Sequence, residues 1–160
     1  MNELAIARAL HVIGVVIWIG GVSMATTAAL PALRCGVFGA DRLAAFQAFE
    51  RRFVWQARGA VVLVGLSGLV MVMKMDLWAR FSEPDFWWMH AMVGLWLVFA
   101  IVLFIAEPLV LHRCFNVWAK RDPDAAFAAL HHAHIVLLVL VLGLVTVFGA
   151  VAGSHGWSPV

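Results

Sequence analysis

The sequence predicts an all-α integral membrane protein, a bundle of four transmembrane helices with both termini on the outer side. Hydrophobic residues make up 64% of the 160 positions and charged residues only 12%, about half of the usual charged share of a soluble domain. Charged residues also divide the chain into four apolar blocks, each close to the ~20 residues that a helix needs to cross a bilayer. We therefore expect a single transmembrane domain over residues 1–160.

The first block carries no charge between Arg8 and Arg34, which is longer than the core of a signal peptide and predicts a retained span. The second block has the shortest uncharged core, residues 59–73, so Arg58 must be paired or must reach the membrane surface. Residues 42–49 predict a short interfacial helix that runs into this second span. The predicted spans are residues 4–30, 53–75, 86–111 and 127–152.

The Lys and Arg residues predict the orientation of the spans. Eight of them lie on the side of the first and third loops, namely Arg34, Arg42, Arg51, Arg52, Arg58, Arg113, Lys120 and Arg121, against Arg8, Lys74 and Arg80 on the other side. Because positive residues favour the cytoplasmic side, both termini should lie outside, in a bacterial-type inner membrane. The basic residues are too dispersed to form a nucleic-acid patch. Cys35 and Cys114 are too far apart to form a metal or disulfide motif.

Two histidines lie within the predicted spans at a similar shallow depth below the outer surface, His11 in the first and His90 in the third. Neutral imidazoles bind iron, copper or zinc, and ionisable residues in a membrane are functional candidates. Gly14 and Trp18 share the face of His11, and Gly94 shares that of His90. These glycines would make room for a haem b with His11 and His90 as its axial ligands. Alternatively, the glycines allow close helix packing and the histidines hydrogen-bond across it.

A second group of histidines lies at the inner side. His112 ends the third span, and His134 opens the fourth together with His131 and His132. A second haem between His112 and His134 and ordinary interfacial histidines are the two interpretations. At the outer rim, Arg8 is a candidate partner for a haem propionate.

Glu107, followed by Pro108, is a carboxylate inside the third span. Because an uncompensated charge is costly in a membrane, we expect either a proton-handling group or a partner for Arg58 or Arg113.

Methionines support a competing prediction. Five of the seven lie at the outer ends of the second and third spans. Thioethers together with imidazoles select Cu(I), although methionine is also a frequent apolar filler. The candidate copper ligands are Met71, Met75, Met89, Met92 and His155, beside His90 and within reach of His11, with Met73 among the same group.

Three runs carry a resemblance to known families: Leu10–Gly21, Phe49–Phe53 and Trp88–Ala91. Together they resemble the CopD-like copper-resistance membrane domains and the related HemJ-type protoporphyrinogen oxidases, over most of the chain. The resemblance to CopD implies copper handling at the outer face. The resemblance to HemJ implies a b-type haem, and the first-span and third-span histidines carry over to His11 and His90. HemJ-type proteins have a His-Ala-Lys pattern where this chain has Met92, so the resemblance implies haem binding rather than porphyrinogen oxidation.

Three functions remain open from the sequence. The leading hypothesis is a membrane cytochrome with one haem b, or two, that exchanges electrons with a quinol or a redox partner protein. The alternative is Cu(I) binding or transport across the inner membrane through the Met and His cluster. A third is a structural accessory subunit of a larger membrane complex. The small residues on the helices also permit a homo-oligomer.

Overall fold

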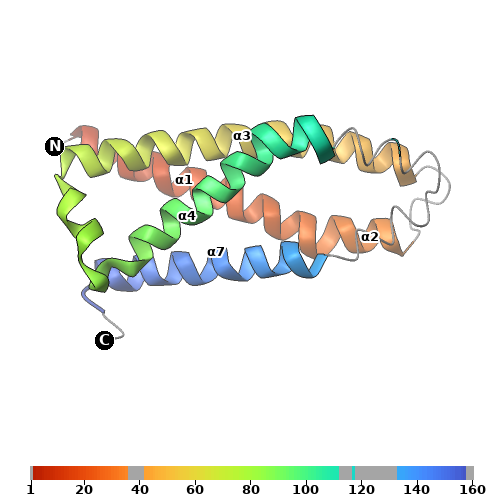
Figure 1. Ribbon diagram of the computed structural model, residues 1–160. Helices are drawn as coiled ribbons and strands as arrows, with labels where there is room; N and C mark the ends of the chain where they lie inside the picture. The colour runs from red at the N-terminus through yellow and green to blue at the C-terminus, as the bar shows by residue number, and fades with distance from the viewer. Residues whose placement is uncertain (1, 36–41, 112–116, 118–132, 158–160) are drawn as a thin grey trace.

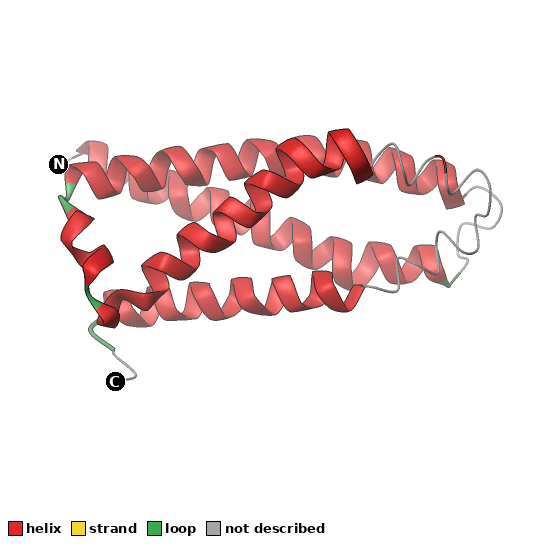
Figure 2. Cartoon of the chain, viewed as in Figure 1, coloured by secondary structure: helices red, strands yellow, loops and turns green. Residues whose placement is uncertain are grey.

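The computed structural model describes residues 2–35, 42–111, 117 and 133–157, and these residues are almost entirely helical, with no strand among them (Figure 2). Two segments, η1 and η5, are π-helical, and two, η3 and η4, are 3₁₀ turns. The elements in order are α1 (Asn2–Met24), η1 (Ala25–Ala29), α2 (Leu30–Arg34), α3 (Arg42–Lys74), η3 (Leu77–Ser82), η4 (Pro84–Phe86), α4 (Trp87–Ile101), η5 (Val102–Leu111) and α7 (Ala133–Ser154).

Three helical stretches are long and apolar enough to cross a membrane: Glu3–Ala32, Gln47–Lys74 and Pro84–Pro108. α7 adds a shorter apolar stretch, Leu138–Ser154. Large apolar side chains point outward along these helices, and Val16, Leu66 and Phe148 are 65%, 61% and 63% exposed. Apolar surface of this extent requires lipid as its solvent. The chain is therefore a membrane protein, as its composition predicts.

α3 is one continuous helix from Arg42 to Lys74. The expected interfacial helix and the second span are therefore parts of the same helix, with no break where the span was predicted to begin. The helix ends at Lys74, and two residues later Asp76 adopts a left-handed conformation with φ of 50°. A short polar side chain tolerates this conformation better than most residues, so Asp76 can turn the chain away from α3.

α1 and α3 lie side by side in opposite directions, whereas α4 crosses the molecule diagonally (Figure 1). α4 begins beside the end of α7 and crosses towards the first half of α3. Its middle contacts both α1 and α3: the Trp18 and Phe99 rings meet edge to face at 4.7 Å, and Trp96 Nε1 donates to the Val61 carbonyl at 2.8 Å. The start of α1 and the end of α7 lie at the same end of the molecule.

The core lies where these helices cross. Its most buried side chain is Val61, which is 1% exposed. Residues from α1, α3, η5 and α7 surround it, namely Trp18, Val22, Ala57, Ala60, Val64, Leu103 and Leu140. Several of these side chains are small, which allows the helix backbones to approach closely.

Both π-helical segments lie next to a proline. η1 ends two residues before Pro31, and η5 contains Pro108. Proline has no N–H to donate and its ring collides with the preceding turn, so a helix that contains proline often changes its winding there. π-helical turns of this kind recur at functional sites.

Candidate functional site

The predicted ligands come from helices that meet at one end of the molecule. The start of α1, the end of α3, the start of α4 and the end of α7 all lie there, joined by η3 and η4 (Figure 1). Among the described residues, no three His, Cys, Asp or Glu side chains gather as a metal-binding group.

The imidazole of His11 lies between α1 and α3, where residues of α3 provide hydrogen-bond partners and room for the ring. Its Nδ1 lies 3.1 Å from the Val64 carbonyl oxygen and 3.2 Å from Ser67 Oγ. A Cβ on Gly68 would meet the imidazole Cε1 at 3.3 Å, so glycine leaves the room that the ring occupies. Because a carbonyl oxygen only accepts, the bond to Val64 requires the proton on Nδ1. Nε2 is then the unprotonated nitrogen, as in histidines that bind a metal through one nitrogen while donating from the other.

The pairing of residues between α1 and α3 indicates where Met71 lies relative to His11. Lys74 pairs with Glu3 at 3.0 Å, and Ser67 contacts His11, so the two helices run antiparallel in a fixed register. In that register Ala7 of α1, which is 7% exposed, lies at the same height along the helix pair as Met71 of α3. Met71 is half-buried and lies one turn beyond Ser67 on the same face of α3.

Met75 lies one further turn along this face and is 39% exposed, and Met73 is 63% exposed. Along α3 the methionines therefore pass from half-buried to exposed towards the end of the helix.

His90 has a different environment from His11. It is exposed, and its ring meets Phe81 of η3 edge to face at 5.4 Å. Its neighbour Met89 is buried at 4%, and Met92 is half-buried. A Cβ on Gly94 would meet nothing within 4 Å, so this glycine makes no close helix contact among the described residues. The contacts of the two imidazoles thus lie on different elements, and the bis-histidine haem stays a prediction.

Two of the other three predicted haem-pocket residues of α1, Gly14 and Trp18, pack against protein. A Cβ on Gly14 would come within 2.8 Å of Val64 Cγ2, so this glycine allows α1 to approach α3. Trp18 is 5% exposed in the core, where its Nε1 has no hydrogen-bond partner among the described residues. Arg8 is exposed. For Gly14 the arrangement matches the close packing that was the alternative to a cofactor cavity.

The remaining predicted histidines are spread over both ends. His155, just after α7, is exposed, and its Nδ1 lies 2.8 Å from the Val151 carbonyl oxygen. His112 lies outside the described residues, together with His131, His132 and Arg113. His134 belongs to the first turn of α7, but its side chain lies outside what the structure describes.

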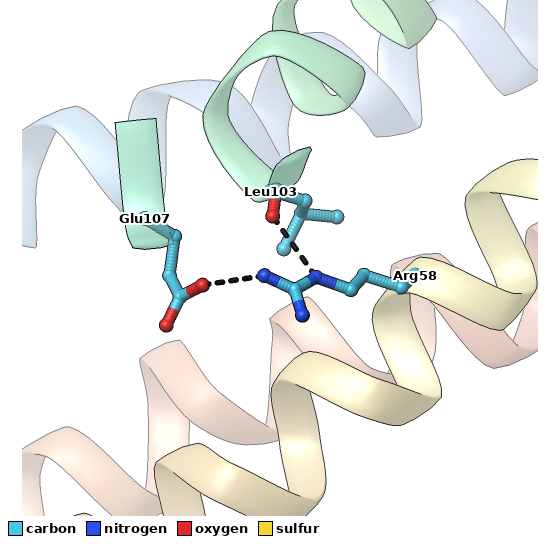
Figure 3. A network of polar contacts seen from close by, with 3 residues as sticks. All are labelled: Arg58, Leu103 and Glu107. Atoms are coloured by element: carbon cyan, nitrogen blue, oxygen red, sulfur yellow. Dashed lines mark hydrogen bonds and ion pairs between the residues drawn. The ribbon is translucent and has the colours of Figure 1, made fainter. Parts of the chain in front are cut away.

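At the opposite end of the α3–α4 contact, Arg58 and Glu107 form an ion pair with an N–O distance of 2.7 Å (Figure 3). Their side chains are 20% and 14% exposed. Arg58 Nε also donates to the Leu103 carbonyl at 3.0 Å, and the guanidinium lies 5.5 Å from the Trp55 ring and 5.8 Å from the Phe104 ring. Arg58 is therefore paired, and Glu107 is its partner.

The Leu103 carbonyl accepts from Arg58 for a reason that lies in its own helix. Leu103 and Glu107 belong to η5. In π-helical winding a carbonyl accepts from the N–H five residues later, which for Leu103 is position 108. That residue is proline and has no N–H. Arg58 supplies the missing donor, so the ion pair and the proline are parts of one arrangement.

Three of these contacts were not predicted from the sequence: Ser67 and Gly68 around His11, and the Leu103 carbonyl under Arg58. One signal was available, because Ser67 is the sole polar residue in the uncharged core 59–73. A lone hydroxyl in a span usually bonds within or between helices. The carbonyl carried no signal, because its partner depends on the winding of η5.

Residues 47–148 of the chain match the family described as copper resistance protein D. No curated protein and no solved structure matches the chain. The matched segment runs from α3 into α7 and includes Met71, Met75, His90 and the Arg58–Glu107 pair, whereas His11 and His155 lie outside it. The HemJ-type resemblance is not shown and stays a prediction. Because the match covers well over half of the 160 residues, this membrane protein belongs to the copper resistance protein D (CopD) family.

Proposed function

We propose that this protein binds Cu(I) at the outer end of its helices and passes it across the membrane. Membership of the copper resistance protein D family carries this proposal. It favours the copper alternative over the haem hypothesis that led from the sequence. The methionines and histidines at one end of the molecule supply donors of the softness that Cu(I) prefers.

Within this group, His11 and Met71 are the proposed inner ligands. His11 is held through Nδ1 by the Val64 carbonyl, which leaves Nε2 for the metal. Met71 is half-buried one turn closer to the outer end of α3. The exposed Met75, His90 and His155 are suited to first contact with the ion, because they lie at the surface of the same end.

The proposed topology is a four-helix bundle in a bacterial inner membrane, with α7 as the fourth span and both termini outside. The start of α1 and the end of α7 lie at the same end of the molecule, which is what an even number of spans requires. The excess of Lys and Arg beyond the other end supports a cytoplasmic location for that end.

Copper titration of the detergent-purified protein tests the proposal. Cu(I) is added under reducing conditions in competition with a coloured Cu(I) chelator, and metal content is measured on the same sample. We expect copper to bind, and His11→Asn and Met71→Leu each to weaken binding by roughly tenfold or more, as expected when one ligand is lost. Asparagine retains an N–H for the Val64 carbonyl, and leucine conserves the volume of methionine, so both variants should fold.

Met24→Leu is the matched control, because Met24 lies at the far end of α1 and is 56% exposed. Its copper affinity should equal that of the unaltered protein. A visible spectrum of the same sample separates the competing functions. Sharp b-type haem bands without copper would establish the cytochrome instead, and a folded protein that binds neither would support the accessory subunit.

A further inference from the structure

We infer that the Arg58–Glu107 pair is a clasp that closes the inner end of the α3–α4 contact, with the π-helical segment around Pro108 as its hinge. The pair holds η5, which continues the diagonal helix α4, where it meets α3. The inference rests on the proposed function in one respect: the passage of copper is the reason why this end of the protein would open.

The clasp combines charge and hydrogen bonding in a membrane-spanning region. Both charges are mostly buried, and each lies within a stretch long enough to cross the membrane. Opening the contact would separate Arg58 from Glu107 and would also leave the Leu103 carbonyl without a donor. Two costs are therefore linked in one movement, which favours a discrete closed state over a gradual loosening.

The hinge follows from the winding of η5. Pro108 cannot donate to the turn before it, and the π-helical turns around it are less regular than an α-helix. η5, which carries Leu103 and Glu107, can therefore bend away from α3 where it continues α4, without breaking hydrogen bonds that a regular helix would have. The start of α4 is held elsewhere, since Trp87 and Trp88 pack on Gly149 and Gly153 of α7. Movement should be confined to the clasp end.

Cysteine labelling from the inner side tests the clasp. In a background with Cys35→Ser and Cys114→Ser, Ala57→Cys places a thiol next to Arg58 at a position that is 4% exposed. Inverted membrane vesicles are treated with a membrane-impermeant thiol reagent, and the labelling rate is measured. Glu107→Gln should raise this rate about tenfold or more, because the carboxylate charge that pairs with Arg58 is lost and the arginine charge is left uncompensated within the span.

Two controls separate the clasp from general loosening. Thr146→Cys places a thiol at a buried position on α7, and its labelling should not respond to Glu107→Gln. Lys74→Ala removes the exposed Glu3 pair at the other end and should leave labelling of Ala57→Cys unchanged.

A double variant tests the role of Pro108. Arg58→Lys keeps the charge but cannot hold both Glu107 and the Leu103 carbonyl in the same geometry, so it should also raise labelling of Ala57→Cys. In a Pro108→Ala background the helix supplies its own donor to Leu103, and the effect of Arg58→Lys should shrink. Equal effects in both backgrounds would contradict the hinge.

The inference is contradicted if, in folded Glu107→Gln protein, the Ala57→Cys thiol is labelled at the same rate as without this substitution. It is also contradicted if Glu107→Gln raises the labelling rate of Thr146→Cys to the same degree. Failure of the copper proposal would appear separately, as an absence of bound Cu(I) with the labelling pattern intact.

Discussion

The α1–α3 contact and the contacts of α4 hold their helices in different ways. α1 lies along α3 from the Glu3–Lys74 pair to the level of Gly21, where a Cβ would meet the Phe53 ring at 3.0 Å. α4 and η5 instead rely on large or charged side chains, among them Trp88 on Gly153, Trp96 on Gly65, Phe99 on Trp18, and the Arg58–Glu107 pair.

The difference concerns how stability is distributed. Many small contacts together hold α1 against α3, so the loss of any one of them should lower the free energy of unfolding only slightly. α4 depends on a few bulky or charged contacts, so a single substitution at one of them should have a larger effect. We therefore regard α1 and α3 as the fixed part of the molecule, and η5, which carries the clasp, as the part that can move.

The largest effect is expected from Gly153→Ala. The added Cβ would overlap the indole of Trp88, which is 9% exposed and has little room to shift. Thermal unfolding in detergent should show a loss of about 2 kcal/mol, as for overpacked cores. Gly94→Ala is the control, because its Cβ would meet nothing within 4 Å. That variant should be neutral or more stable by up to ~1 kcal/mol, and equal losses in both would contradict the role of Gly153.

Trp96→Phe should have an intermediate effect. Phenylalanine retains a ring over Gly65 but cannot donate to the Val61 carbonyl, which Trp96 Nε1 reaches at 2.8 Å. We expect a loss of about 1 kcal/mol in the free energy of unfolding. Trp78→Phe, at a position that is 55% exposed, should cost less in the same assay. The opposite order would show that Trp96 does not hold α4 to α3.

Lys74→Ala, at the α1–α3 contact, should have the smallest effect on the free energy of unfolding. The Lys74 and Glu3 side chains are 59% and 81% exposed, and water screens their attraction. The expected loss is below ~0.5 kcal/mol, and it should vanish when unfolding is measured in high salt. A loss as large as that of Gly153→Ala would show that the α1–α3 contact is not evenly shared.

Part of the candidate site was predictable from the sequence. Because a charge in a span is costly, Arg58 was expected to be paired or to reach the membrane surface, and Glu107 was expected either to handle protons or to pair with Arg58 or Arg113. The methionines could be assigned to one end from their positions in the helices. That Glu107 pairs with Arg58, and that the Leu103 carbonyl accepts from the same side chain, depended on the tertiary structure and on the winding of η5.

By itself, the sequence determined that this is a helical membrane protein, because the lengths of its apolar blocks match a bilayer. Only the tertiary structure decided which faces meet. Helices that are apolar on all sides carry no stripe to indicate their orientation, so the sequence placed Gly14 and Gly94 in equivalent roles. In the structure Gly14 packs on Val64, whereas a Cβ on Gly94 would meet none of the described residues within 4 Å. For the same reason the sequence alone did not distinguish His11, which packs against α3, from His90, which is exposed.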